Sequence, residues 1–164
     1  MAVCFSVQAE ATAQYPFLAS LSTASQTQIT SFIESVYADL FNRAADSGGL
    51  AYWDNYLTTN LGNPQAVGAF VLAVINGAQG TDQTTITNKV TVADYFTQEL
   101  AAAGVSFTSA ANTLAQTAIA SVTSAPLSVV LAESTINTWL TTQPSAGEVA
   151  LVGVSHASAA SAIS

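Results

Sequence analysis

The chain has 164 residues, of which 50% are hydrophobic and only 7% are charged, and two cationic against ten acidic residues give a net charge of −8. So few cations cannot form the basic surface that binds nucleic-acid phosphates or anionic membranes, and both classes of partner are excluded. No apolar run approaches the roughly 18 residues that a membrane-spanning helix needs, so we predict no membrane span. The length predicts about one domain with a core of its own.

Residues 1–24 are rich in Ala and Ser, and Pro16, which stands between Tyr15 and Phe17, would interrupt a helix through this segment. We predict an N-terminal arm here, or a short helix followed by a turn. Cys4 is the one cysteine of the chain, so no disulfide can form within it. The segment has neither a cationic start nor a sustained apolar run, so we expect no cleavable secretion signal.

A clear helical pattern begins at Ser25 and predicts a first long helix, because its apolar residues recur at the spacing of one helix face. These residues are Ile29, Phe32, Ile33, Val36, Tyr37, Leu40 and Phe41. Asp46 then stands in an N-cap position for a second helix, where its carboxylate would accept from backbone N–H groups of the first turn. The second helix has its apolar side at Leu50, Trp53, Leu57 and Leu61.

Pro64 suits the first position of a third helix. We predict a loop over residues 76–82 after this helix. A long fourth helix follows from Asp82 to Ala103, and Gly104 ends it. We expect the third helix to bury Val67, Phe70, Val71, Val74 and Ile75. We expect the fourth to bury Ile86, Val90, Ala93, Phe96 and Leu100.

Two more helices are predicted, at about 109–122 and 126–142, and alternation over residues 148–155 is compatible with a strand. We expect these two helices to present Leu114 and Ile119, and Leu127, Val130, Leu131 and Trp139, to the core. The predicted fold is therefore all-α: a compact bundle of about five to six helices over residues 25–143, with a less regular N-terminal arm at 1–24 and a C-terminal tail at 144–164.

The corner between the first two helices contains the most distinctive residues of the chain. In our preferred interpretation Arg43 pairs with Asp46, Asp46 caps the second helix, Gly48 and Gly49 allow close backbone approach, and Trp53 fills the core. The alternative is a calcium site, for which Asp46, Asp54 and Asp82 are the candidate oxygen ligands. A calcium loop normally supplies several carboxylates at alternate positions, which this stretch does not.

Aromatic residues of the second helix suggest a second kind of site. Tyr52 and Tyr56 could stack against sugar rings, with Asn55 supplying hydrogen bonds. The alternative places Trp53 in the core with the two tyrosines at its edge.

Enzyme motifs are absent from the sequence. His156 is the one histidine and has no positioned acid beside it, and one histidine with one cysteine cannot supply a zinc site. We therefore predict a protein without catalytic residues, with either no cofactor or Ca²⁺. Lys89 is expected to be a solvated helix residue, with an ion pair between subunits as the alternative.

The stretch from Phe32 to Trp53, FIESVYADLFNRAADSGGLAYW, resembles the helical module called DUF4214. Residues 76–82 and 88–97 resemble its continuation, so the resemblance covers about residues 30–100. The module recurs in exported bacterial surface proteins, including S-layer-like proteins and proteins with calcium-binding nonapeptide repeats. Such nonapeptides are absent from this chain, and the family has no established catalytic residues.

The resemblance implies a bacterial cell-surface or extracellular location, reached by type I secretion with an uncleaved C-terminal signal. With the low charge, it leads to the expectation of a non-enzymatic structural protein that self-assembles as a homo-oligomer or polymer into a surface layer, sheath or filament. The alternative is a carbohydrate-binding anchor that attaches an exoprotein to lipopolysaccharide or capsule, with a cell-surface polysaccharide as partner.

Overall fold

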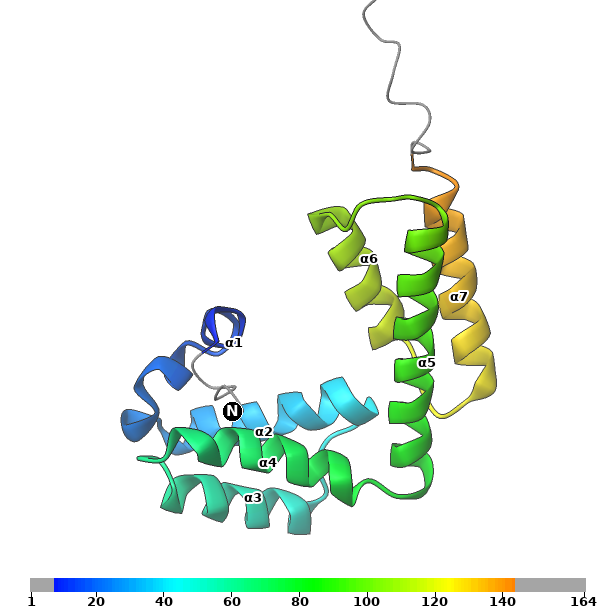
Figure 1. The fold of residues 1–164 in the computed structure, drawn as a ribbon. Helices are drawn as coiled ribbons and strands as arrows, with labels where there is room; N and C mark the ends of the chain where they lie inside the picture. The colour runs from blue at the N-terminus through cyan, green and yellow to red at the C-terminus, as the bar shows by residue number, and fades with distance from the viewer. Residues whose placement is uncertain (1–7, 144–164) are drawn as a thin grey trace, which may run out of the picture.

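A computed structural model describes residues 8–143, and this part of the chain is helical with no strand, which confirms the predicted all-α class (Figure 1). The C-terminal tail at 144–164 and the candidate strand at 148–155 lie outside the described residues. No described helix is long and apolar enough to cross a membrane. The elements are α1 (Ala9–Gln14), the 3₁₀ helix η2 (Pro16–Thr23), α2 (Gln26–Phe41), α3 (Ser47–Thr59), α4 (Pro64–Gly77), α5 (Gly80–Ala102), α6 (Ser109–Ala120) and α7 (Pro126–Leu140).

The helices form two groups, each around its own hydrophobic cluster (Figure 1). The N-terminal lobe contains α1 to α4, and the C-terminal lobe contains α5, α6 and α7, which run steeply across the direction of α2. The long helix α5 belongs to both, because Ile86 near its start packs on the first cluster while Val92 and Phe96 belong to the second. The predicted bundle is therefore built from two smaller cores.

Phe32 of α2 is the centre of the N-terminal lobe. Its fully buried ring meets the rings of Tyr15, Phe17 and Phe70 at centroid distances of 5.0, 5.6 and 5.7 Å. Leu18 of η2 is also buried in this cluster. Of the alternatives predicted for residues 1–24, the short helix is present as α1, but the 3₁₀ helix η2 follows it in place of a turn, and both pack against the core instead of extending as an arm.

The buried stripe of α5 differs from the expected one. Val90 was expected inside and is 54% exposed, while Thr85 and Lys89 are buried on the face that carries Val92. The prediction assumed that the buried face would be the apolar one. The inward face of α5 instead includes two polar side chains where the helix passes the end of α2.

The outward face of α7 is the second departure. Leu127, Val130 and Leu131 were expected in the core, but all three are exposed, and the buried residues of α7 are Ala132 and Ile136. A small residue such as Ala132 lets α7 approach α5 and α6 closely. The larger apolar residues consequently face away from the lobe.

Many threonines on the C-terminal helices donate their hydroxyl to the carbonyl oxygen four residues earlier. This pattern uses the side-chain donor within its own helix. It occurs at Thr84, Thr85, Thr87, Thr91, Thr97, Thr113, Thr117, Thr135 and Thr138, with O···O distances of 2.8 to 3.0 Å.

Polar contacts join the two lobes at the C-terminal end of α2. Lys89 is 9% exposed, and its Nζ donates to the backbone oxygen of Asp39 at 2.7 Å. The last carbonyls of a helix have no partner within it, so Lys89 satisfies one of them and places a cation at the negative end of the helix. The Asn42 side chain donates to the Ala120 oxygen at 2.8 Å. The expectation of a solvated Lys89 was wrong, because α2 ends directly against α5.

Replacing Lys89 by Met should lower the free energy of unfolding by about 1–2 kcal/mol at pH 7, because Met leaves the Asp39 carbonyl without the hydrogen bond that Lys89 donates. Burial lowers the pKa of Lys89 below its ordinary value of 10.5. Between the lowered pKa and 10.5 the unfolded chain binds more protons than the folded chain, so wild-type stability rises with pH there relative to Lys89→Met.

Urea unfolding of both proteins at pH 7 and at stepped pH values up to 10.5 measures this difference. If the difference in stability between wild type and Lys89→Met stays constant or shrinks as the pH rises, Lys89 is not a buried group with a lowered pKa.

Candidate functional site

The corner between α2 and α3 is a polar site of the N-terminal lobe whose side chains form several hydrogen bonds. Helix α2 ends at Asn42, which adopts a left-handed conformation with φ of 56°. Asn tolerates this conformation better than other non-glycine residues do, so the chain can reverse sharply here. The reversal places Arg43 and the following residues beside the start of α3.

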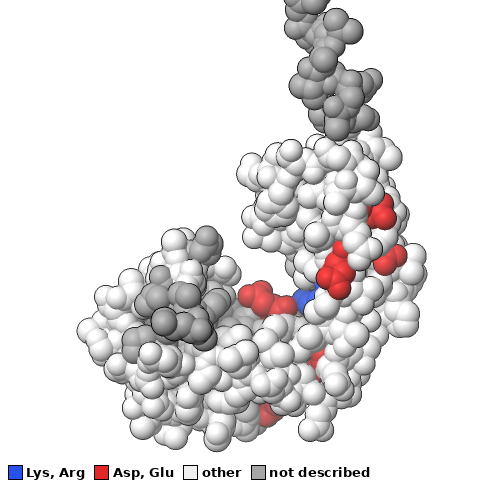
Figure 2. Space-filling model, viewed as in Figure 1, with Lys and Arg blue, Asp and Glu red and all other residues white. Residues whose placement is uncertain are grey.

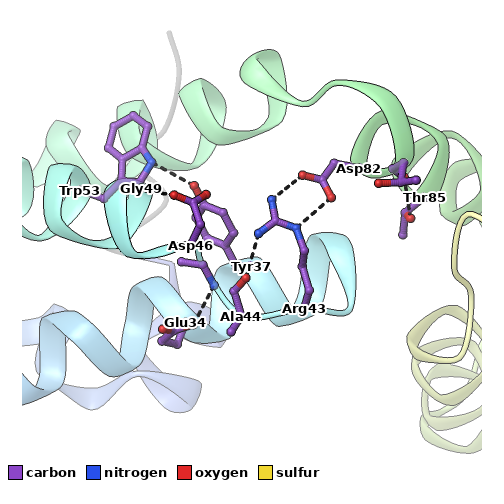
Figure 3. Close-up of polar contacts among 11 residues, drawn as sticks. Glu34, Tyr37, Arg43, Ala44, Asp46, Gly49, Trp53, Asp82 and Thr85 are labelled. Carbon is purple, nitrogen blue, oxygen red and sulfur yellow. Dashed lines mark hydrogen bonds and ion pairs between the residues drawn. The ribbon is translucent and has the colours of Figure 1, made fainter.

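Two carboxylates hold the corner (Figure 3). Glu34 of α2 accepts from the Ala45 N–H at 2.9 Å, and Asp46 accepts from the Gly49 N–H at 2.8 Å. The second contact is the predicted N-cap of α3. This hydrogen bond from Gly49 is the main reason that the pKa of Asp46 is lowered, so the cap is charged and intact at neutral pH.

Of the two corner glycines, Gly49 has the closer neighbours. A Cβ at Gly49 would lie 3.2 Å from the Tyr37 hydroxyl and 3.3 Å from Oδ2 of Asp46. At Gly48 the nearest atom would be Oδ1 of Asp46 at 3.4 Å, an ordinary contact. The expected close backbone approach is therefore real at Gly49.

Trp53 was predicted to fill the core, and it is instead partly buried and packs against the hydrophobic cluster. Its Nε1 donates to the Tyr37 hydroxyl at 3.2 Å (Figure 3). Its ring also packs against Phe70 in a T-shaped arrangement, at a centroid distance of 5.1 Å. Tyr52 and Tyr56 flank the indole at 4.8 and 5.8 Å. Trp53 thus connects the corner to the hydrophobic cluster.

Arg43 pairs with Asp82 of α5, not with Asp46 as the sequence suggested. Its Nε and Nη2 donate to the two Asp82 oxygens at 3.0 and 2.6 Å, and its Nη1 donates to the Ala44 oxygen at 2.8 Å (Figure 3). The hydrogen bond with Asp82 raises the pKa of Arg43. The charge of Arg43 still contributes to the lowered pKa of Asp46. The prediction favoured Asp46 because it is close to Arg43 in the sequence, but the turn at Asn42 directs the guanidinium toward α5.

A hollow of about 210 Å³ lies over this corner, between α2, α3 and the end of α4. Its walls include the rings of Tyr37 and Phe41, over which the Arg43 guanidinium sits at 5.4 and 5.5 Å from the ring centroids. Asp46 and Trp53 also line it. The polar groups of the hollow already bond to one another, so the arrangement fixes the corner.

The three candidate calcium ligands do not converge. Asp54 accepts from the side chains of Gln26 and Thr30 of α2, the latter at 3.0 Å, whereas Asp46 caps α3 and Asp82 binds Arg43. Within residues 8–143, no group of three or more acidic, His or Cys side chains is placed to hold a metal ion. Asp54 thus joins α3 to α2 and Asp82 joins the corner to α5, whereas Asp46 acts within α3.

The candidate glycan residues lie together on α3 but differ in exposure. Tyr52 is 63% exposed and Asn55 is also exposed, whereas Tyr56 is partly buried and packs on the hydrophobic cluster. Tyr52 therefore offers the most accessible ring of this group.

Sequence reasoning missed Glu34 and the partner of Arg43. Glu34 lies on α2 between buried residues, and its role as a cap for the Ala45 N–H depends on a contact across 11 residues. The sequence did contain one signal. Asp82 was assigned to the candidate calcium site, but in a chain with only two cations it was also a possible ion-pair partner for Arg43.

The comparison with protein families concerns this same lobe. Residues 16–73 match the family model described as Domain of unknown function (DUF4214). The DUF4214 match starts at η2 and ends within α4, so it includes the whole corner from Arg43 to Trp53. It is shorter than the expected 30–100 at its C-terminal end and leaves α5 outside. Neither the curated proteins nor the solved structures gave a significant match.

The two glycines of the corner provide a matched test. Gly49→Ala should lower the free energy of unfolding by about 1 kcal/mol, because the new methyl crowds the Tyr37 hydroxyl and the capping carboxylate. Gly48→Ala should leave stability unchanged or raise it by up to about 1 kcal/mol through helix propensity. Urea unfolding of the two variants measures both effects, and equal stabilities would show that the close approach at Gly49 has no consequence.

Proposed function

We propose that this chain is a non-enzymatic structural protein of the bacterial cell exterior that self-assembles into a surface layer, sheath or filament. The observation that carries the proposal is a set of large apolar side chains, each more than half exposed, on both lobes. Single exposed apolar residues are ordinary, but a contiguous group commonly marks contacts with other proteins, and the three such residues of α7 lie on one side of that helix. The set is Tyr52, Leu72, Val90, Phe107, Leu127, Val130 and Leu131.

The low charge of the surface supports the same proposal. Figure 2 shows that most of the viewed face is uncharged, with acidic side chains gathered beside a cation near the junction of the two lobes. Glu34, Asp46, Asp54 and Asp82 are engaged in hydrogen bonds within the chain. Copies of the protein can therefore approach over the uncharged part of this face with few acidic side chains between them.

The location outside the cell rests on the DUF4214 match to residues 16–73, together with the exported proteins in which this module recurs. An acidic chain with two cations suits a calcium-rich exterior, where divalent ions would reduce repulsion between copies.

Negative-stain electron microscopy of the purified chain tests the proposal. We expect ordered filaments or sheets at high protein concentration, with calcium, with magnesium and with neither. An effect of calcium beyond that of magnesium would show that acidic side chains bridge subunits. Dispersed single particles in all three conditions would contradict self-assembly.

The second candidate function is a carbohydrate-binding anchor, favoured by the exposure of Tyr52 beside Asn55 on α3. Tyr52→Ala should then weaken binding to lipopolysaccharide or capsular polysaccharide at least tenfold, because a stacking ring is lost. The control is Leu72→Ala on α4, a site of similar exposure. Binding by isothermal titration calorimetry and Tm by circular dichroism are measured for both variants, and equal binding would contradict a site at Tyr52.

A further inference from the structure

The connection between the two lobes contains the one Asn-Gly pair of the chain. Asn76 and Gly77 are the last two residues of α4, and the two residues that follow lead into α5 (Figure 1). Both members of the pair are exposed. The family match ends before them, at residue 73, so the pair lies in the part of the chain that the DUF4214 match leaves out.

Asn76 differs from most other asparagines of the described chain in what its side chain contacts. Most of the others are held by a hydrogen bond within the chain, whereas no such bond joins the Asn76 amide to another described residue. The held side chains, with donor–acceptor distances of 2.8 to 3.1 Å, are those of Asn42, Asn60, Asn63, Asn88 and Asn137. The exposed Asn76 side chain can therefore rotate toward its own backbone.

The backbone at Gly77 is also accessible. Glycine is the poorest helix former after proline, and the terminal turn of a helix opens at little cost in free energy. The Ala78 N–H closes α4 on the oxygen of Ile75 at 3.2 Å, a bond that spans three residues instead of four. A Cβ placed on Gly77 would meet no atom within 4 Å, so no neighbour crowds this residue. Opening of the last turn therefore exposes the Gly77 nitrogen.

We propose that Asn76–Gly77 is a site of spontaneous succinimide formation, at which Asn76 is converted to Asp and isoaspartate. The Gly77 backbone nitrogen loses its proton and attacks Cγ of Asn76. A C–N bond forms, and the side-chain amide takes up a proton and leaves as ammonia. A water molecule then opens the cyclic imide at either carbonyl and gives Asp or, where the main chain now runs through Cγ, isoaspartate. The inference is independent of the proposed self-assembly.

The conversion places a new carboxylate at the C-terminal end of α4. This end of a helix carries partial negative charge, and the last turn of α4 has no basic residue that would offset another anion. Isoaspartate also lengthens the main chain by a CH₂ group next to the connection between the lobes. Both products should therefore loosen the end of α4 and lower the Tm of the chain.

Peptide mapping by mass spectrometry, after incubation of the folded full chain at mildly alkaline pH, measures the conversion at each asparagine. Asn76 should react at least about ten times faster than Asn112, an exposed residue of α6 that precedes Thr113, because glycine has no side chain to hinder its nitrogen. Gly77→Ala is the matched variant. Its methyl group has room and favours the helix, and it should slow the reaction at Asn76 at least about tenfold.

Isoaspartate identifies the route, because direct hydrolysis of the amide gives Asp alone. Equal rates at Asn76 and Asn112, or a product without isoaspartate, would overturn the proposal.

The effect of the new charge is measured separately with Asn76→Asp, which imitates one product. Its Tm by circular dichroism should be lower than that of wild type. Asn112→Asp is the control, because Asn112 lies in the first turn of α6, where an acid is favourable, and its Tm should be unchanged or higher. A Tm of Asn76→Asp at or above that of wild type would contradict the loosening of α4.

Discussion

The end of helix α2 is the constraint on which the arrangement of the two lobes depends. The chain has two cations, and both act there. Lys89 binds the carbonyl oxygen of Asp39, and Arg43, just past the end of the helix, reaches Asp82. Both contacts connect α2 with α5, the helix shared by the two hydrophobic clusters. A helix end must satisfy its last carbonyls, and here the second lobe supplies the partner.

The acidic residues of the N-terminal lobe also bind groups within the chain. Glu34 and Asp46 bind backbone N–H groups around the corner, and Asp54 joins α3 to side chains of α2. In an apolar and charge-poor chain, these few carboxylates fix the corner and hold α3 against α2. This explains why a corner rich in acids, aromatics and glycine resembles a ligand site in sequence while its groups bind one another.

Much of the fold could be predicted from the sequence, because its signals are local. The apolar spacing of α2, the cap at Asp46 and the stop before Pro64 each depend on residues within about one or two helical turns. The partner of Arg43 could not be predicted in this way, since Asp82 lies 39 residues away and a nearer acid was available. The buried Lys89 was missed because α5 crosses the polar end of another helix, where the inward face need not be apolar. On α7, Ala132 lies inside and larger apolar residues lie outside, so side-chain size alone pointed to the wrong face.

The threonines of α5, α6 and α7 change what this surface offers to water. A hydroxyl that donates to the carbonyl oxygen one turn earlier has used its only proton, but its oxygen can still accept a hydrogen bond. The exposed threonines of these helices therefore present acceptors rather than donors, and a partner that supplies N–H or O–H groups suits such a surface better than one that supplies further acceptors.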